Sequence, residues 1–241
     1  MKRPFLWAHR GASCCAPENT MAAFAAAVES GADGLELDIH LSRDGIPVVI
    51  HDETLQRTTD GHGPVVRMTW QQLQRLDAGS WFASEFTGES IPCLEEVLNT
   101  FGGRLRLNLE LKEFRAGMAV LELLKQYPSA QVVVSSFNYD LLRRLRSADG
   151  HLSLAVLFDS GSWRYAVKTA SDLSACTFHP EVNLVTRPMI AACTLAGLPV
   201  FVWTVDRACT ARSLIRAGAA GLFTNDPAKL SSVFQSPEFS T

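Results

Sequence analysis

Long hydrophobic runs, strong charge and paired cysteine motifs are all missing from this 241-residue sequence. No apolar run approaches the ~18 residues that a membrane span requires. The first residues, MKRPFLWAHRG, offer only a short apolar stretch before His9, too short for the core of a signal peptide. A net charge of −3 provides no basic face for nucleic acid or acidic lipid. We therefore expect a cytoplasmic protein that binds no nucleic acid and has no stable membrane association.

The six cysteines are spaced irregularly and form no Cys-x-x-Cys pair. This spacing fits neither a zinc site nor a disulfide framework, so we interpret them as small buried or half-buried thiols. Cys14 and Cys15 are adjacent, but a stable disulfide between them is not expected in a reducing compartment.

Short β-rich runs alternate with amphipathic segments along most of the chain, and 47% of the residues are hydrophobic. This alternation predicts a parallel sheet with right-handed crossovers. Eight such strands predict an α/β fold, a closed (β/α)8 TIM barrel whose site lies at the carboxyl ends of the strands, and a chain of this length suits one domain over residues 1–241. The expected strands end at His9, Asp38, Lys112, Phe137, Phe158, Phe178, Val205 and Asn225.

One pair of strands lacks an intervening helix. Only Arg43, Asp44 and Gly45 separate ELDIHLS from IPVVIHD, and Asp-Gly between apolar runs predicts a hairpin. A two-residue loop at Asp44-Gly45 would place Asp38 opposite His51, with Glu36 on the same face.

Residues 54 to about 92 do not fit the repeat, and we interpret them as an insertion lying over the barrel mouth. The rings of Trp81 and Phe82 are expected to pack between this insertion and the barrel. The residues from Ser236 onward are expected to form a loose tail.

Four strand-like runs end in ionisable side chains: PFLWAHRG, GADGLELDIHL, IPVVIHDE and RLRLNLELK. Gathered at one sheet edge, they would bring together His9, His51 and a group of carboxylates and cations. Glu36, Asp38 and Glu110 form an all-oxygen ligand set, which favours one divalent cation, Mg²⁺ or Ca²⁺, over zinc. The alternative is that these carboxylates only form salt bridges with cationic neighbours.

The cations among these endings are Arg10 and Lys112, which fit as clamps on phosphate oxygens. A metal ion and two cations could neutralise charge at phosphorus, so the inventory is typical of metal-assisted phosphate-ester chemistry. Among the other histidines, His40, His62 and His151 lack such a context and are interpreted as packed or solvated.

Nearly end to end, the chain resembles the glycerophosphodiester phosphodiesterase family. The matching segments are His9-Arg10-Gly11, Pro17-Glu18-Asn19-Thr20, Glu36-x-Asp38, His51-Asp52, Arg57-Thr58-Thr59, Leu76-Asp77-Ala78-Gly79-Ser80-Trp81, Ile91-Pro92, Glu110-x-Lys112, Ser135-Ser136-Phe137, Trp203-Thr204-Val205 and Thr224-Asn225-Asp226-Pro227. One departure is Cys14-Cys15, where family members often have a glycine and then a variable residue, which puts the conformation of this loop in doubt.

The resemblance implies metal-dependent hydrolysis of glycerophosphodiesters to sn-glycerol 3-phosphate and an alcohol. It implies that His9 and His51 are the acid–base pair and that Glu36, Asp38 and Glu110 hold the metal. Arg10 and Lys112 would then bind the phosphate. Three further residues are assigned to the substrate pocket: Glu18, which could instead cap the first helix or orient Arg10, together with Phe137 and Trp203.

Three other functions remain open on the sequence alone. The nearest is a lysophospholipase D-type or other phosphodiesterase on the same barrel. A barrel glycosidase with two carboxylates would need no metal and would not need Lys112. A catalytically inactive barrel serving as a binding module is the third, although every motif residue is present. The small-molecule substrate's head group and the oligomeric state cannot be read from the sequence.

Overall fold

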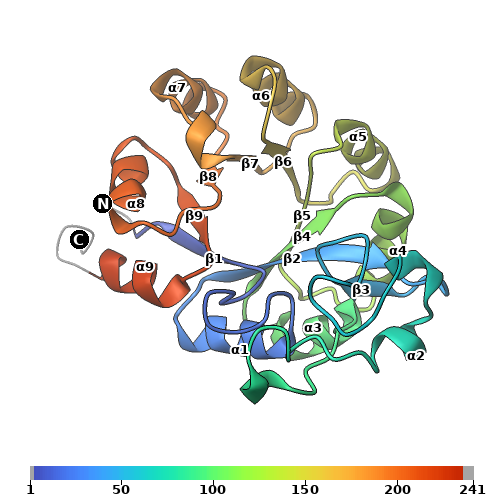
Figure 1. Ribbon diagram of the computed structural model, residues 1–241. Helices are drawn as coiled ribbons and strands as arrows, with labels where there is room; N and C mark the ends of the chain where they lie inside the picture. The colour runs from blue at the N-terminus through green and yellow to red at the C-terminus, as the bar shows by residue number, and fades with distance from the viewer. Residues whose placement is uncertain (1–2, 236–241) are drawn as a thin grey trace.

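The computed structural model describes residues 3–235, and within that range eight parallel strands form a nearly closed barrel with helices between them (Figure 1). The tail expected from Ser236 lies outside the described residues. The parallel strands are β1 (Phe5–His9), β2 (Gly34–Leu41), β4 (Arg106–Leu111), β5 (Val132–Ser136), β6 (Leu154–Phe158), β7 (Thr177–Pro180), β8 (Phe201–Val202) and β9 (Gly221–Thr224).

The strands follow the order β7-β6-β5-β4-β2-β1-β9-β8 around the ring. Parallel bridges between Phe178 and Val200 and between Glu181 and Trp203 connect β7 with the β8 segment and complete the circle. β1 lies between β2 and β9, so the start of the chain is held by both an early and a late strand. The predicted barrel is therefore confirmed.

Helices cover the outside of the ring, as Figure 1 shows. They are α1 (Met21–Glu29), α3 (Leu94–Phe101), α4 (Phe114–Leu124), α5 (Tyr139–Ala148), α6 (Trp163–Asp172), α7 (Arg187–Leu195), α8 (Ala208–Arg216) and α9 (Pro227–Phe234). Thr20 caps α1, because its side chain accepts from the backbone N–H of Ala23 at 3.3 Å.

The two faces of β2 explain why its acidic side chains point into the ring. Leu35, Leu37 and Ile39 are fully buried in the main apolar cluster between strands and helices. Side chains alternate along a strand, so Glu36 and Asp38 point to the opposite side, into the ring. Burying the apolar face against the helices therefore fixes the direction of the acidic side chains.

The hairpin between β2 and β3 (Pro47–Val49) has a different register from the predicted one. Ile39 pairs with Val49 and Leu41 with Pro47, so Asp38 lies opposite Ile50 rather than His51. The loop has three residues instead of two. Gly45 closes it with φ +83, the left-handed conformation that such three-residue loops require.

The insertion lies to one side of the ring, next to β3, α1 and α3, and not across the mouth (Figure 1). It contains η1 (Val65–Arg67), α2 (Trp70–Leu73) and η2 (Ser84–Phe86). Its apolar residues form a separate small core with Val48 and Ile50, which draws it toward the β3 edge.

The rings of Trp81 and Phe82 do not pack between the insertion and the barrel, contrary to the expectation from the sequence. Trp81 is 42% exposed, its ring contacts Phe82, and Phe82 contacts Phe86. These rings therefore pack within the insertion. No helix within residues 3–235 is long and apolar enough to cross a membrane.

Candidate active site

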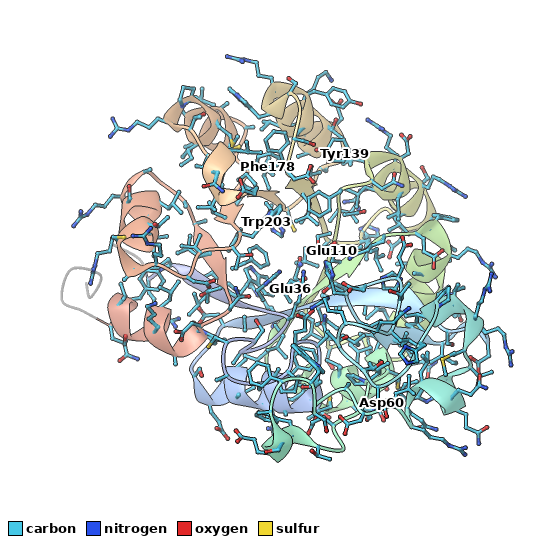
Figure 2. All side chains as sticks on the ribbon, viewed as in Figure 1. Glu36, Asp60, Glu110, Tyr139, Phe178 and Trp203 are labelled. Atoms are coloured by element: carbon cyan, nitrogen blue, oxygen red, sulfur yellow. The ribbon has the colours of Figure 1, made fainter. Side chains whose placement is uncertain are left out.

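Three carboxylates meet inside the ring at the carboxyl ends of β2 and β4. Asp38 and Glu110 are register partners on these parallel strands, and Glu36 lies two residues before Asp38. One ligand oxygen from each residue lies within 4.8 Å of the others. Figure 2 shows Glu36 and Glu110 near the centre of the ring, whereas Asp60 of the insertion lies at its periphery.

The electrostatics of this cluster favour a bound cation. Burial, followed by repulsion from Asp38 and Glu110, raises the pKa of Glu36 well above its usual value. Burial and Asp38 raise the pKa of Glu110 to about 7. Burial opposes ionisation of Asp38 too, but Arg10 and Lys112 outweigh it and lower that pKa.

Two buried oxygens near this cluster lack hydrogen-bond partners among the described residues, Asp38 Oδ1 and Asn108 Oδ1. Oxygen atoms without donors, beside carboxylates that repel one another, fit a hard divalent cation. The donor set therefore agrees with the metal that the sequence predicts.

The end of β1 turns sharply to place Arg10 against the carboxylates. Arg10 has φ +57 and Gly11 has φ +84, so two successive residues are left-handed. The turn directs the backbone N–H of Arg10 to Glu36 Oε2 at 2.9 Å. The guanidinium lies 3.2 Å from Asp38 Oδ2 and donates to Glu18 Oε1 at 2.9 Å.

Arg57 of the insertion connects Glu18, which contacts Arg10, with Asp52, which contacts His51. The sequence analysis assigned Arg57 no role. It donates to both oxygens of Glu18 at 2.8 Å and to both oxygens of Asp52 at 2.7 and 2.9 Å. Asp52 Oδ1 in turn lies 2.6 Å from Nδ1 of His51. The Arg57-Thr58-Thr59 motif is the sequence signal that could have indicated this network.

His51 reaches the site although the register prediction was wrong. β3 ends at Val49, so residue 51 lies beyond the ladder and strand alternation no longer applies. Its carbonyl accepts from Lys112 Nζ at 2.9 Å and from His40 Nε2 at 3.1 Å. His40 is two residues from Asp38, on the same strand face, and this spacing could have identified it as a supporting residue.

His9 is the register partner of Glu36 on the neighbouring strand. Its Nε2 lies 4.0 Å from Glu36 Oε2, and its Nδ1 lies 2.8 Å from Asn225 Oδ1. Burial and the adjacent Arg10 lower the pKa of His9, so the neutral ring is favoured.

A cavity of about 210 Å³ joins these groups. His9, His51, Glu36 and Glu110 line it together with Phe137 and Trp203, whose rings lie edge to face at 5.6 Å. Asp38 and Lys112 are not among its lining residues. Glu18 does not line this cavity, because both its oxygens bond Arg57 and one also bonds Arg10, so its place beside substrate stays a prediction. A larger hollow of about 800 Å³ at the opposite end of the barrel contains none of the predicted site residues.

Comparisons with known proteins agree with this arrangement. The model of the glycerophosphoryl diester phosphodiesterase family matches residues 9–229. The glycerophosphodiester phosphodiesterase of Caldanaerobacter subterraneus subsp. tengcongensis is 39% identical over 233 residues, covering 92% of this chain and 94% of the relative.

Solved structures are similar over almost the whole chain. An Oleispira antarctica phosphodiesterase in complex with the product sn-glycerol-3-phosphate superimposes with a TM-score of 0.89 and 33% identity, covering 97% of both chains. A glycerophosphodiester phosphodiesterase from Agrobacterium tumefaciens has a TM-score of 0.85 and 30% identity, covering 96% of this chain and 100% of the other.

Proposed function

The chain belongs to the glycerophosphoryl diester phosphodiesterase family, and from this premise we propose that it hydrolyses glycerophosphodiesters to sn-glycerol 3-phosphate and an alcohol. The observation that carries the proposal is a single cavity lined by His9, His51, Glu36 and Glu110, with Asp38 completing the carboxylate cluster beside it. The product-bound Oleispira relative supports the same class of product.

Glu36, Asp38 and Glu110 would hold one divalent cation, Mg²⁺ or Ca²⁺. When bound, this ion would supply positive charge against the phosphate oxygens in the transition state. The raised pKa values of Glu36 and Glu110 support the assignment, because both carboxyls are poorly stabilised as anions without a cation beside them.

Arg10 and Lys112 would bind the phosphate oxygens from the side of the carboxylates. Arg10 is anchored by Glu18, and Lys112 by the carbonyl of His51 at 2.9 Å and by Asp38 Oδ1 at 3.6 Å. Fixed cations of this kind stabilise developing charge without reorganising during the reaction.

His9 and His51 would share the proton transfers. One imidazole takes the proton of the glycerol 2-hydroxyl as its oxygen bonds to phosphorus, which yields a cyclic phosphodiester. The bond from phosphorus to the head-group oxygen breaks, and the other imidazole gives that oxygen its proton. Water then opens the ring with the two roles exchanged.

Phe137 and Trp203 would wall the glycerol moiety. Trp203 is fixed by its indole N–H, which donates to the carbonyl of His179 at 2.8 Å. Flat, fixed rings suit the carbon face of a small polyol, whose hydroxyls remain free for the polar wall.

The test is turnover of a panel of glycerophosphodiesters, with release of glycerol 3-phosphate measured with and without chelator. We expect hydrolysis that EDTA abolishes and Mg²⁺ or Ca²⁺ restores. His9→Ala and His51→Ala should each lower kcat by ~10²–10⁴-fold with a smaller change in KM. Full activity of verified metal-free protein would overturn the metal assignment.

The cyclic intermediate has its own test. A 2-deoxy analogue of glycerophosphocholine retains every phosphate oxygen but lacks the attacking hydroxyl. It should bind as a competitive inhibitor and turn over very slowly. Comparable turnover of the two compounds would mean that water attacks phosphorus directly.

A further inference from the structure

Behind His9, on the side away from the cavity, lies a chain of polar side chains. Asn225 Oδ1 lies 2.8 Å from His9 Nδ1, and Asn225 Nδ2 donates to Asp206 Oδ2 at 2.7 Å. Asp206 follows β8 and Asn225 follows β9, so this series of hydrogen bonds connects the ends of β8 and β9 with His9 at the end of β1. The hydrolysis proposed above assigns no role to Asn225 or Asp206.

The orientation of the Asn225 amide follows from its partners. The carboxylate of Asp206 can only accept, so the amide NH₂ must face Asp206 and the amide oxygen must face His9. Asp206 is itself fixed, since its Oδ1 accepts from the Asn225 backbone N–H at 2.8 Å and from Thr224 Oγ1 at 2.9 Å. The amide therefore cannot rotate without losing a charge-assisted hydrogen bond.

The loop after β1 holds Asn225 from the other side. Ser13 Oγ lies 3.0 Å from Asn225 Oδ1, and the backbone N–H of Cys14 donates to the Asn225 carbonyl at 3.0 Å. Both the side chain and the backbone of Asn225 are thus fixed relative to His9.

A fixed amide oxygen decides which ring nitrogen of a neutral histidine carries the proton. Because this oxygen only accepts, His9 Nδ1 must be the N–H, and the lone pair remains on Nε2. Nε2 lies on the cavity side, 4.0 Å from Glu36 Oε2. At His51 the acceptor beside Nδ1 is instead the carboxylate of Asp52, at 2.6 Å.

We propose that Asn225 and Asp206 are positioning residues that hold His9 in its Nδ1–H tautomer, so that Nε2 is the atom that exchanges protons with substrate. This inference deepens the proposed function and rests on it for the identity of the substrate group that exchanges a proton with His9. The tautomer itself is a property of the protein without substrate and can be measured separately.

The first experiment is ¹⁵N NMR of ¹⁵N-histidine-labelled intact protein at mildly alkaline pH, where the neutral rings are observed. The His9 resonances are assigned from their loss in His9→Gln. We expect a protonated Nδ1 and an unprotonated Nε2 in the wild type. Asn225→Ala should give a mixture of tautomers, and Asn99→Ala, an exposed asparagine on α3 that accepts from Tyr127, should match the wild type. A protonated Nε2 in the neutral wild-type ring would overturn the proposal.

The second experiment is steady-state kinetics of the same variants. Asn225→Ala should lower kcat by ~10–100-fold, the usual cost of losing a partner that orients a functional histidine, with a smaller effect on KM. Asp206→Asn keeps the shape and an acceptor oxygen, so it should lose less than Asn225→Ala. It also serves as the test if Asn225→Ala does not fold.

The positioning role of Asn225 and Asp206 and the proposed substrate class can be refuted separately. Wild-type tautomer and kcat retained in both Asn225→Ala and Asp206→Asn would remove the positioning role but leave the hydrolysis intact. A wild type with the expected tautomer that releases no glycerol 3-phosphate from any glycerophosphodiester would remove the proposed substrate class instead.

Discussion

Glu110→Gln should make the metal-free protein more stable while it weakens the enzyme. Burial and repulsion by Asp38 raise the pKa of Glu110 from 4.5 to about 7. At about 1.4 kcal/mol per pKa unit, ionising this carboxyl in the folded protein costs up to about 3 kcal/mol more than in the unfolded chain. The side chain is 15% exposed, so solvent screens little of this cost.

The direction of this stability difference follows from proton linkage. The folded carboxyl binds its proton more tightly than the unfolded one, so metal-free wild type loses stability as the pH rises from 4.5 to 7. Glutamine has no proton to lose and removes this penalty. With metal present the difference between the two proteins should narrow, because an ion at 100 times its Kd stabilises the folded wild type by about 2.7 kcal/mol. The variant, with only Glu36 and Asp38 left as anions, should gain less.

The assay is urea unfolding of both proteins above pH 7, in EDTA and in excess Mg²⁺. Glu122→Gln is the matched control, because Glu122 is an exposed carboxylate on α4 that pairs with Lys125. A Glu110→Gln protein that is less stable than wild type in EDTA would refute the reasoning. Equal stabilisation of both proteins by Mg²⁺ would show that Glu110 does not contribute to the metal site.

Three further outcomes are expected. Gly11→Ala should lose about 2 kcal/mol or more in urea unfolding, since φ is +84 and the new Cβ would lie 2.7 Å from the Ala23 backbone, and an unchanged midpoint would contradict this. Arg57→Ala should reduce kcat ~10-fold by releasing Asp52 from its pairing, and Arg57→Lys, which cannot bond both carboxylates twice, should not restore it. Hydrogen bonds from Ser80, Gly79 and Gly88 lower the pKa of Asp77, so the stability that Asp77 gives the insertion should be present above pH 3.8 and lost as the pH falls further. Asp77→Asn should therefore speed limited proteolysis of the insertion at neutral pH. Equal proteolysis rates for the variant and the wild type would count against this reasoning.

Strand periodicity and strand endings were enough to predict the barrel and the meeting of Glu36, Asp38 and Glu110. Both depend on a simple rule, that parallel strands present their carboxyl ends together. The helix α6, Trp163–Asp172, is hard to predict from the sequence because WRYAVKTASD has few long aliphatic residues. It is stabilised instead by Ser162 as a cap and by burial of small side chains.

The hairpin shows where local rules stop. Asp44-Gly45 suggested a two-residue loop, but Ser42 Oγ contacts Asp44 and accepts the backbone N–H of Ile46, which stabilises a three-residue one. The register therefore shifted by one residue. His51 still arrives because Lys112 and His40 hold its carbonyl, and contacts between distant segments cannot be read from spacing along one strand.

The position of β1 between β2 and β9 has a consequence for the order in which the enzyme acquires its activity during synthesis. All of the proposed metal, phosphate and acid–base groups lie within the first 112 residues and leave the ribosome early. Asn225, however, emerges more than a hundred residues later and reaches His9 only when β9 pairs with β1. If Asn225 orients His9 as proposed, an unfinished or C-terminally truncated chain would carry all of the proposed reacting groups and still lack a correctly oriented His9, so activity would require pairing of β9 with β1.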